Sequence, residues 1–188
     1  MRWLPDAMGR LQAAALELFL ERGYEATTVA DIAERAGLTK RTFFRYFADK
    51  REVLFIGSER LVEAFVAAVT QAPAEAPPLA AMEAGLHALG DSFTAERHRF
   101  AAERAAIIAS SPELQERELI KLAAMAAAAA AALRARGVGE PAATLAADAA
   151  ITVFRVAFSR WVADDRPEGF RALTRESLDT LRMLAAAP

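Results

Sequence analysis

The sequence contains no cysteine among its 188 residues. Disulfides, thiolate chemistry and cysteine-based zinc sites are therefore excluded, and the composition is compatible with a reducing cytoplasm. No apolar run reaches the ~20 residues that a bilayer-spanning helix needs, and residues 1–5 lack the apolar stretch of a secretory signal. We therefore expect a soluble, cytoplasmic protein with no membrane partner.

Sequence motifs of enzymes are also missing. There is no glycine-rich phosphate loop, no Gly-x-Ser-x-Gly and no His-Glu-x-x-His. His87 and His98 are too isolated for a metal site, and His98 lies between two arginines, which favours a solvated face over contact with a ligand phosphate. A pair of catalytic carboxylates could still lie in a helical pocket, but no spacing nominates one, and solvation explains Asp164-Asp165 better. We expect no catalysis, no cofactor and no metal.

What the chain does contain is alanine and other apolar residues, which together make up 54% of the sequence, with few β-branched runs. This composition favours helices over strands. A chain of this length can bury a substantial core. The prediction is an all-α protein with about nine helices.

Residues 27–50, TTVADIAERAGLTKRTFFRYFADK, predict two short helices joined by a tight turn. Thr28 and Asp31 form a capping-box pattern for the first helix, and Gly37 ends it by permitting a left-handed backbone. Thr39 caps the second helix. The second helix carries no acid in its first turn, which would suit a site where phosphates supply the negative charge. We expect its inward face to carry Phe43, Tyr46 and Phe47. We expect its outward face to carry Lys40, Arg41, Phe44 and Arg45.

A net charge of −2 does not by itself suggest a nucleic-acid partner. However, residues 39–51 contain five lysines and arginines against one aspartate, a local excess of four positive charges. Local charge is what a phosphate senses within the ~8 Å Debye length of physiological salt.

In order and without gaps, residues 8–60 resemble the DNA-binding domain of the TetR family of bacterial transcription regulators. The matching positions are Leu18-Phe19, Gly23-Tyr24, Thr27-Thr28, Ile32-Ala33, Ala36-Gly37-Leu38-Thr39, Tyr46-Phe47, Lys50 and Leu54. The resemblance implies a three-helix helix-turn-helix domain whose third helix recognises double-stranded DNA at a palindromic operator.

The resemblance further implies phosphate contacts from Thr27 or Thr28, and from Thr39, Tyr46 and Lys50. It implies that Lys40, Arg41, Thr42 and Arg45 face base edges. Phe44 departs from the family pattern, which usually has tyrosine here. A hydroxyl contact with phosphate is thereby lost, and an apolar contact such as a thymine methyl group can replace it.

The residues of this helix also indicate a base preference. The chain has no asparagine, and residues 28–50 contain no glutamine, so bidentate readout of adenine is not available. Lys40, Arg41 and Arg45 favour guanine, so each half-site is expected to place G·C pairs under the start of the helix.

The remainder of the chain is expected to be helical throughout. A connector helix from Asp49 to Gln71 ends at the proline-rich segment 72–78, which divides a DNA-binding domain (1–71) from a helical ligand-binding and dimerisation domain (79–188). The alanine run 126–132 is expected to be a helix face against which another backbone packs. The last helix is expected to open at Arg166-Pro167.

The last two helices carry apolar residues on more than one side, which favours burial against a second subunit. The family resemblance likewise implies a homodimer formed through these two helices. Arg155 interrupts an apolar run; we expect it to pair with an acid such as Asp148 across the dimer or to reach solvent, with a ligand-facing role as the alternative.

Candidate effector-binding residues are aromatic or soft apolar side chains of this second domain, together with that arginine. They are Phe93, Phe100, Met125, Phe154, Arg155, Phe158 and Trp161. The effector is expected to be small and apolar. The second half also resembles that of TetR-type regulators with an acyl-CoA-like ligand.

These observations favour a homodimeric, ligand-responsive transcription regulator, and the family resemblance implies a repressor that an effector releases from DNA. The alternative is a helical protein that binds or sequesters a small molecule and whose basic helix is only a solvated face.

Overall fold

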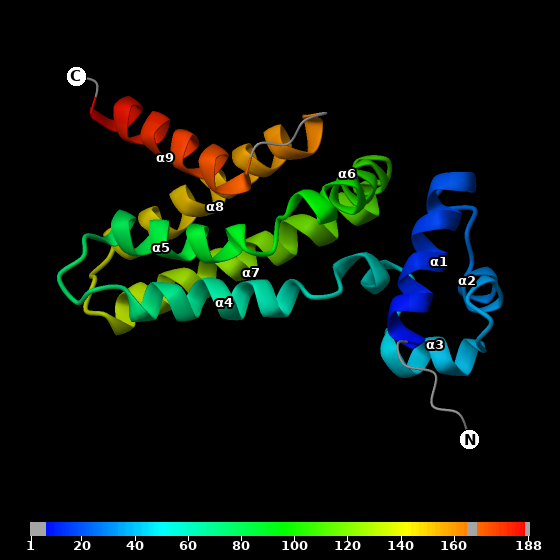
Figure 1. Cartoon of the computed structure of the whole chain (residues 1–188). Helices are drawn as coiled ribbons and strands as arrows, with labels where there is room; N and C mark the ends of the chain where they lie inside the picture. The colour runs from blue at the N-terminus through cyan, green and yellow to red at the C-terminus, as the bar shows by residue number, and fades with distance from the viewer. Residues whose placement is uncertain (1–6, 165–168, 187–188) are drawn as a thin grey trace. The chain divides into compact units, whose positions relative to one another are not determined.

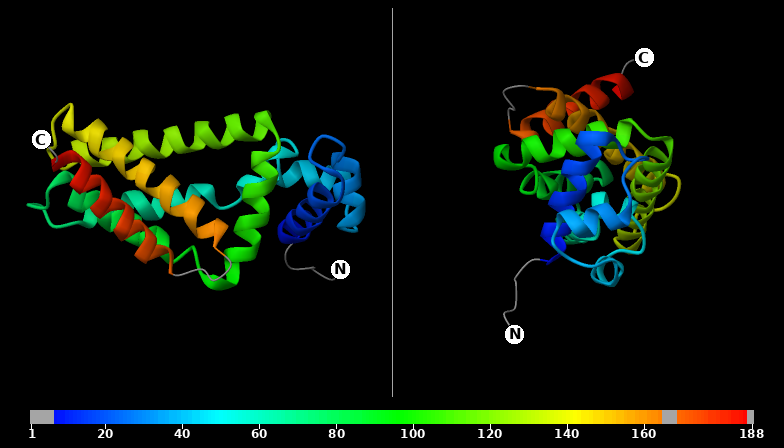
Figure 2. Two further views of the ribbon diagram at one scale, coloured as in Figure 1. Left: turned by 90° about the horizontal axis from the view of Figure 1, so that it is seen from above. Right: turned by 90° about the vertical axis from the view of Figure 1, so that its right-hand side faces the viewer.

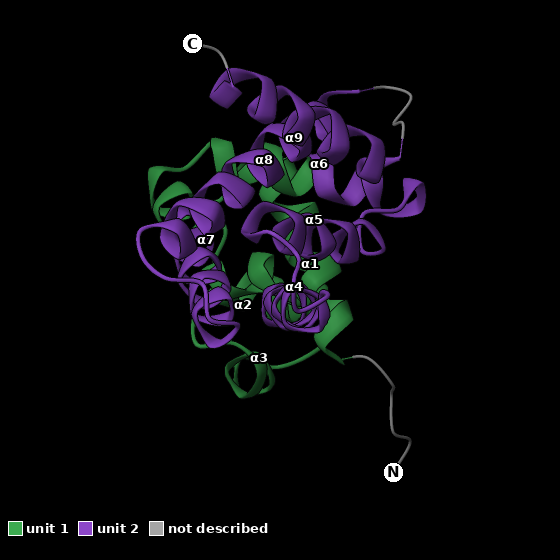
Figure 3. Ribbon diagram, turned by 90° about the vertical axis from the view of Figure 1, so that its left-hand side faces the viewer, with its two compact units in different colours: residues 1–57, 103–118 green, residues 58–102, 119–188 purple. Residues whose placement is uncertain are grey.

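The structure is a computed structural model that describes residues 7–164 and 169–186. Within these residues every regular element is helical, which confirms the all-α prediction with its nine α-helices. The chain forms two compact units, drawn in two colours in Figure 3. Unit 1 comprises residues 1–57 and 103–118, and unit 2 comprises residues 58–102 and 119–188. The compact units therefore do not follow the predicted division into residues 1–71 and 79–188.

Unit 1 contains three α-helices and a short 3₁₀ helix from the start of the chain: α1 (Ala7–Arg22), α2 (Val29–Arg35), α3 (Lys40–Tyr46) and η1 (Arg51–Phe55) (Figure 1). Its core is built from side chains such as Leu11, Leu18, Ile32 and Phe43, each of which is completely buried. Tyr24 is buried in the same core and is 3% exposed. The three helices form one small hydrophobic core.

The second segment of unit 1 comes from the end of α6 (Ala95–Ala109) and the start of α7 (Pro112–Ala135). Ile107, Ile108 and Leu114 are buried in the same hydrophobic cluster as the side chains of α1 to α3. Nothing in the sequence pattern predicted that this corner would share the core of the first domain.

The predicted connector helix from Asp49 to Gln71 is wrong as a single element. A helix does start here, where the Asp49 carboxylate accepts the backbone N–H groups of Arg51 and Glu52 at 2.8 and 3.3 Å. That helix is η1, which is followed by Gly57 with φ at +81°. A left-handed residue ends the helix, so α4 (Ser58–Gln71) starts separately.

Unit 2 is a bundle of α4, α5 (Pro78–Gly90), α8 (Ala142–Ala163) and α9 (Phe170–Ala186), together with residues 95–102 of α6 and 119–135 of α7 (Figure 2). Within it α5 packs against α4, α8 and α9. The α4–α5 contact depends on Gly85, because a Cβ there would lie 2.9 Å from the ring of the buried Phe65. The predicted start of α9 at Arg166-Pro167 lies outside the described residues, as does Asp165.

Helix α7 contains the alanine run, and this run is helical as predicted. Ala126, Ala129, Ala130 and Ala132 are at most 8% exposed and belong to the core of unit 2. At the end of α7, Arg136 donates hydrogen bonds to the carbonyl oxygens of Ala72 and Pro73. The guanidinium therefore satisfies backbone oxygens beyond the C-terminus of α4.

Helix α8 is the one described helix that is long and apolar enough to cross a membrane, judged by length and composition. Eight of its side chains, among them Ala150, Ile151 and Trp161, are buried inside unit 2. This burial is typical of the core helix of a helical bundle.

Candidate nucleic-acid interface

The turn between α2 and α3 is fixed by side-chain caps and one glycine. The Thr28 hydroxyl accepts the backbone N–H of Asp31 at 3.2 Å, and the Asp31 carboxylate accepts the backbone N–H of Thr28 at 2.9 Å. The predicted capping box is therefore confirmed. The backbone N–H and the hydroxyl of Thr28 both donate to the Asp31 carboxylate, and these two hydrogen bonds lower its pKa below the ordinary value.

Gly37 has φ at +64°, and the backbone N–H of Leu38 bonds to the carbonyl oxygen of Ala33 at 2.8 Å. The next helix begins after Thr39, whose hydroxyl accepts the backbone N–H of Thr42 at 3.1 Å. The Thr39 and Thr42 hydroxyls also lie 3.0 Å apart. The direction of α3 is thus set by local hydrogen bonds as well as by packing.

Helix α3 has one buried face and one exposed face. Phe43 and Phe47 are 0% and 5% exposed and anchor the helix to the core of unit 1. Phe44 and Tyr46 are 56% and 42% exposed. The assignment of Tyr46 to the inward face is therefore wrong, because the next core position after Phe43 is Phe47, four residues along the helix.

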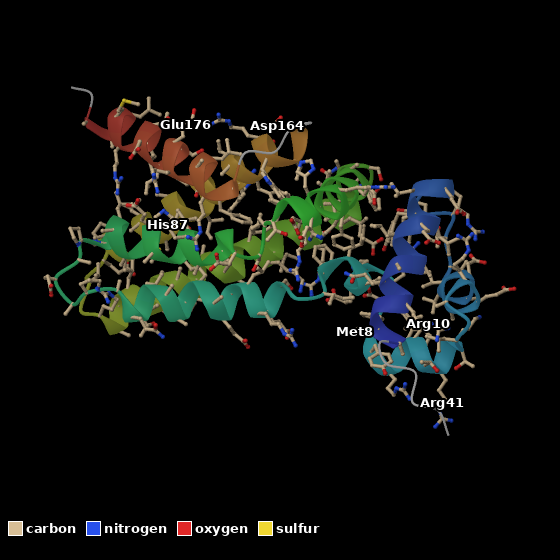
Figure 4. The ribbon with its side chains drawn as sticks, in the orientation of Figure 1. Met8, Arg10, Arg41, His87, Asp164 and Glu176 are labelled. Atoms are coloured by element: carbon tan, nitrogen blue, oxygen red, sulfur yellow. The ribbon has the colours of Figure 1, made fainter. Side chains whose placement is uncertain are left out.

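The exposed face of α3 carries positive charge. Lys40 and Arg41 are exposed, and among the described residues neither makes an ion pair or a side-chain hydrogen bond. Figure 4 shows Arg41 extending away from the ribbon. Arg45 is also exposed, but its guanidinium donates to the Tyr46 hydroxyl at 3.1 Å and lies 4.9 Å from the centre of that ring. Within the described part of the chain, two cations therefore have no ion pair or side-chain hydrogen bond, and a third is held beside a tyrosine.

Two of the candidate phosphate-binding residues are engaged inside unit 1. Thr27 is 1% exposed, and its hydroxyl donates to the carbonyl oxygens of Gly23 and Leu18 at 2.8 and 3.3 Å. The structure therefore removes Thr27 from the exposed surface and leaves Thr28, which is exposed. The Lys50 ammonium donates to the carbonyl oxygens of Tyr24 and Thr27 at 2.8 and 3.3 Å.

The same ammonium lies 4.0 Å from the centre of the Tyr24 ring. Lys50 therefore satisfies backbone oxygens of the loop between α1 and α2 and is not a free cation on the surface. Sequence alone could not distinguish this role from a phosphate contact, because both need a lysine near the end of the domain.

Sequence reasoning missed a group of polar side chains that ties the α6–α7 corner to η1. Arg117 donates to the Glu52 carboxylate at 2.6 Å, and Arg51 lies 3.1 Å from that of Glu113. Arg104 donates to the carbonyl oxygen of Leu54 at 2.6 Å and to Glu118 at 2.9 Å. These contacts hold residues 103–118 on the rest of unit 1.

Burial and charge shift two ionisable groups at this corner. Burial raises the pKa of Tyr24, and the nearby Glu113 carboxylate raises it further. The Tyr24 hydroxyl lies 3.4 Å from that carboxylate. Hydrogen bonds from the Arg51 side chain lower the pKa of Asp49. Both side chains therefore keep their usual protonation state at neutral pH.

The candidate effector residues are only partly brought together. Phe93, Phe154, Phe158 and Trp161 form one aromatic cluster with Phe170, with ring centres 4.5 to 6.2 Å apart. Phe170 was not among the candidates. In this cluster Trp161 and Phe170 are 1% exposed, whereas the other three rings are half-buried.

The remaining candidates lie outside this cluster. Phe100 is 37% exposed, and Met125 is 5% exposed in the core of unit 2. Arg155 is exposed, which agrees with the expectation that it reaches solvent. The interpretation of His98 as part of a solvated face is wrong, because its Nε2 lies 2.8 Å from the carbonyl oxygen of Trp161 and its ring packs edge-on against the indole.

Comparison with known proteins adds evidence on family. Residues 11–55 match the model of "Bacterial regulatory proteins, tetR family". The HTH-type transcriptional regulator TcmR of Streptomyces glaucescens is 49% identical over 88 residues, which are 47% of this chain and 39% of TcmR. The HTH-type transcriptional activator FasR of Mycolicibacterium smegmatis is 37% identical over 67 residues, 36% of this chain and 31% of FasR. Residues 11–55 of this chain therefore belong to the TetR family.

The match to these two curated relatives thus covers less than two fifths of the length of either. Solved structures extend the likeness in fold to nearly the whole of this chain. SmeT, the repressor of the Stenotrophomonas maltophilia multidrug efflux pump SmeDEF, superposes with a TM-score of 0.61 at 23% identity, over 94% of this chain and 89% of SmeT. Thermus thermophilus FadR, solved with lauroyl-CoA, gives 0.56 at 21% identity, over 96% of each chain. At this level of identity the likeness shows the fold alone.

Proposed function

We propose that this TetR-family protein is a cytoplasmic, homodimeric transcription regulator that binds a palindromic operator and is released by a small apolar effector. The observation that carries the proposal is the exposed face of α3, where Lys40 and Arg41 have no partner among the described residues. Such a face suits phosphate and base-edge contacts in a major groove. The buried Phe43 and Phe47 hold it rigidly on unit 1.

The expected DNA contacts are divided between phosphates and bases. Thr28, Thr39 and Tyr46 are exposed at the ends of α2 and α3 and carry hydroxyl groups suited to phosphate oxygens. Lys40 and Arg41 are expected to reach guanine. Thr42 and Arg45 complete the face, and Arg45 would have to exchange its contact with Tyr46 for one with DNA.

Dimerisation is supported by apolar side chains on the last two helices. Leu145 and Val156 of α8 are 64% and 48% exposed, and Met183 and Leu184 of α9 are 67% and 71% exposed. A second copy that covers these side chains would remove them from water. Two recognition helices could then reach successive major grooves about 34–36 Å apart.

An apolar effector is supported by the half-buried rings of Phe93, Phe154 and Phe158, which offer aromatic surface next to the core of unit 2. The lauroyl-CoA bound to one structural neighbour makes an acyl-CoA-like ligand one candidate class. Repression is the expected sign of regulation. The curated relatives include both an activator, FasR, and a repressor, KstR2 of Mycobacterium tuberculosis.

The left-handed Gly57 separates η1 from α4, so no continuous helix joins the units there. The chain passes between the units once at residues 57–58 and twice within helices, in α6 near residue 102 and in α7 near residue 118. A helix transmits a displacement along its axis better than a glycine hinge does. We therefore infer that α6 and α7, anchored by Arg104 and Arg117, carry the two-state shift that lowers operator affinity.

The test is DNA binding at two salt concentrations, with sites selected from a pool of random duplexes. The wild-type protein should enrich a palindrome with G·C pairs in each half-site, and its affinity should fall steeply with salt. Arg41→Ala should weaken binding to the enriched palindrome by ~5- to 150-fold per half-site and relax the preference for guanine, as loss of a bidentate base contact does.

The matched control is Arg60→Ala, which removes an exposed arginine from α4 of unit 2. This variant should bind as the wild type does. If no sequence were enriched, or if binding were indifferent to salt, the protein would instead be a helical small-molecule-binding protein without a DNA function.

A further inference from the structure

Phe44 is the apolar residue at the centre of a cationic helix face. It is 56% exposed on α3, whereas the neighbouring aromatic residues Phe43 and Phe47 are buried in the core. An aromatic ring left in water gains nothing for the stability of unit 1. The burial of Phe43 and Phe47 already anchors the helix, so Phe44 is not needed for packing.

The ring of Phe44 is nevertheless held in place. It packs edge-on against Phe43, with the ring centres 5.6 Å apart and the ring planes at 82°. Phe43 is 0% exposed, so it offers a fixed surface to its neighbour. An oriented ring loses little conformational freedom when it contacts a partner.

The polar residues around Phe44 narrow what it can contact. Arg41 lies three residues before it and Lys40 four, so all three side chains share one stripe of the helix, with neighbouring Cβ atoms ~5–6 Å apart. Arg45 is occupied with the Tyr46 hydroxyl, and Thr42 with the hydroxyl of Thr39. Phe44 has no donor or acceptor, so it cannot bond to a phosphate or to a polar base edge.

The major groove offers one apolar feature at base edges, the C5 methyl group of thymine. We propose that Phe44 reads this methyl group at one position of each half-site. The thymine lies within about two base pairs of the guanine contacted by Arg41 or Lys40, because the base-pair rise is ~3.4 Å and the Cβ atoms are ~5–6 Å apart. This inference rests on the proposed function and names a base that the basic residues alone do not specify.

The experiment removes the methyl group without changing any hydrogen-bonding group. In the selected palindrome, each thymine is replaced in turn by deoxyuridine, and the dissociation constant is measured by fluorescence anisotropy. Replacing the contacted thymine in one half-site should lower the affinity of the wild-type protein about fourfold, the fold-change expected for one methyl-sized group. Replacing the symmetric thymine in the other half-site as well should lower it about fifteenfold. At that position, 5-methylcytosine should bind more tightly than cytosine.

Matched variants assign the effect to the ring. Phe44→Ala should bind thymine and deoxyuridine palindromes equally, while Phe44→Leu should retain part of the difference because it keeps an apolar side chain. Arg41→Ala should bind more weakly overall but still distinguish the two palindromes. Since Phe44 is exposed, all three proteins should melt as the wild type does by circular dichroism.

The outcomes separate this inference from the proposed function. Enrichment of a palindrome with equal binding of deoxyuridine at every position would overturn the inference and leave the regulator intact. A methyl effect that persists in Phe44→Ala would place the readout on another residue and would also overturn it. Failure to enrich any sequence would overturn the proposed function itself.

Discussion

The two units of this protein are stabilised in different ways. Unit 1 contains two seven-residue helices, α2 and α3, whose starts are fixed by the hydroxyls of Thr28 and Thr39. Unit 2 contains helices of up to 22 residues, and many of the buried side chains in its core are alanines and aromatic rings. Short capped helices specify a rigid surface with few residues. Long helices with broad apolar faces allow small rearrangements around a ligand, which would suit the effector-binding role that we propose for unit 2.

The sharpest test of this comparison is to damage one unit and follow the other. Phe43→Ala removes a completely buried ring from unit 1 and should lower its free energy of unfolding by ~3–5 kcal/mol. Trp161 is buried in unit 2, so in a Trp3→Phe background its fluorescence reports the unfolding of that unit.

If the units are independent, the urea midpoint followed by Trp161 fluorescence should stay near that of the unmutated background while the capacity to bind DNA is lost. A Trp161 transition that moves with Phe43→Ala would show instead that the corner at residues 103–118 couples the two units into one cooperative system.

A second test concerns the close packing of unit 2. In Gly85→Ala the new Cβ would lie 2.9 Å from the Phe65 ring, which is itself completely buried. The expected loss of stability is ~1–3 kcal/mol, although alanine in a helix would otherwise be favourable. Chemical unfolding measures the effect. Gly139→Ala is the control, because a Cβ there meets nothing within 4 Å; equal stability of the two variants would contradict the packing argument.

The smallest expected effect concerns the cap of α2. Hydrogen bonds from Thr28 lower the pKa of Asp31 in the folded protein, so the ionised carboxylate contributes stability above its unfolded pKa, near 3.8. That contribution is lost as the pH falls through the lower folded value. The stability difference between wild type and Asp31→Asn should therefore be constant near neutral pH and shrink below about pH 4. Thermal unfolding of both proteins from pH 3 to pH 7 measures it, and a difference independent of pH would contradict this account.

The features that the sequence predicted are those whose cause is local. The caps at Thr28 and Thr39 and the left-handed turn at Gly37 depend on residues three or four positions apart, and they were predicted correctly. Gly57 was missed, although a glycine followed by Ser58 is a readable stop and start signal. The apolar periodicity that continues on both sides of it concealed the break.

Other features depend on contacts between distant residues and left no local signal. Thr27 and Thr28 are adjacent and chemically identical, yet one is buried because its hydroxyl meets the carbonyl oxygen of Leu18. The Lys50 ammonium is engaged because the carbonyl oxygens of Tyr24 and Thr27, in the loop after α1, accept its hydrogen bonds. The packing of the helices in unit 2 brings Phe170, which was not a candidate, into the aromatic cluster, and it leaves the candidates Phe100 and Met125 outside it. The exposed face of α3 could thus be predicted more completely than the aromatic cluster of unit 2.

The inclusion of residues 103–118 in unit 1 has a practical consequence for protein engineering. A hybrid that joins the first 57 residues to the remainder of another regulator would leave the hydrophobic core without Ile107, Ile108 and Leu114. Such a hybrid is expected to express poorly or to aggregate, whereas a graft that transfers both segments together would keep its interior filled. Exchange of operator specificity between relatives therefore requires two pieces of chain to be moved as one.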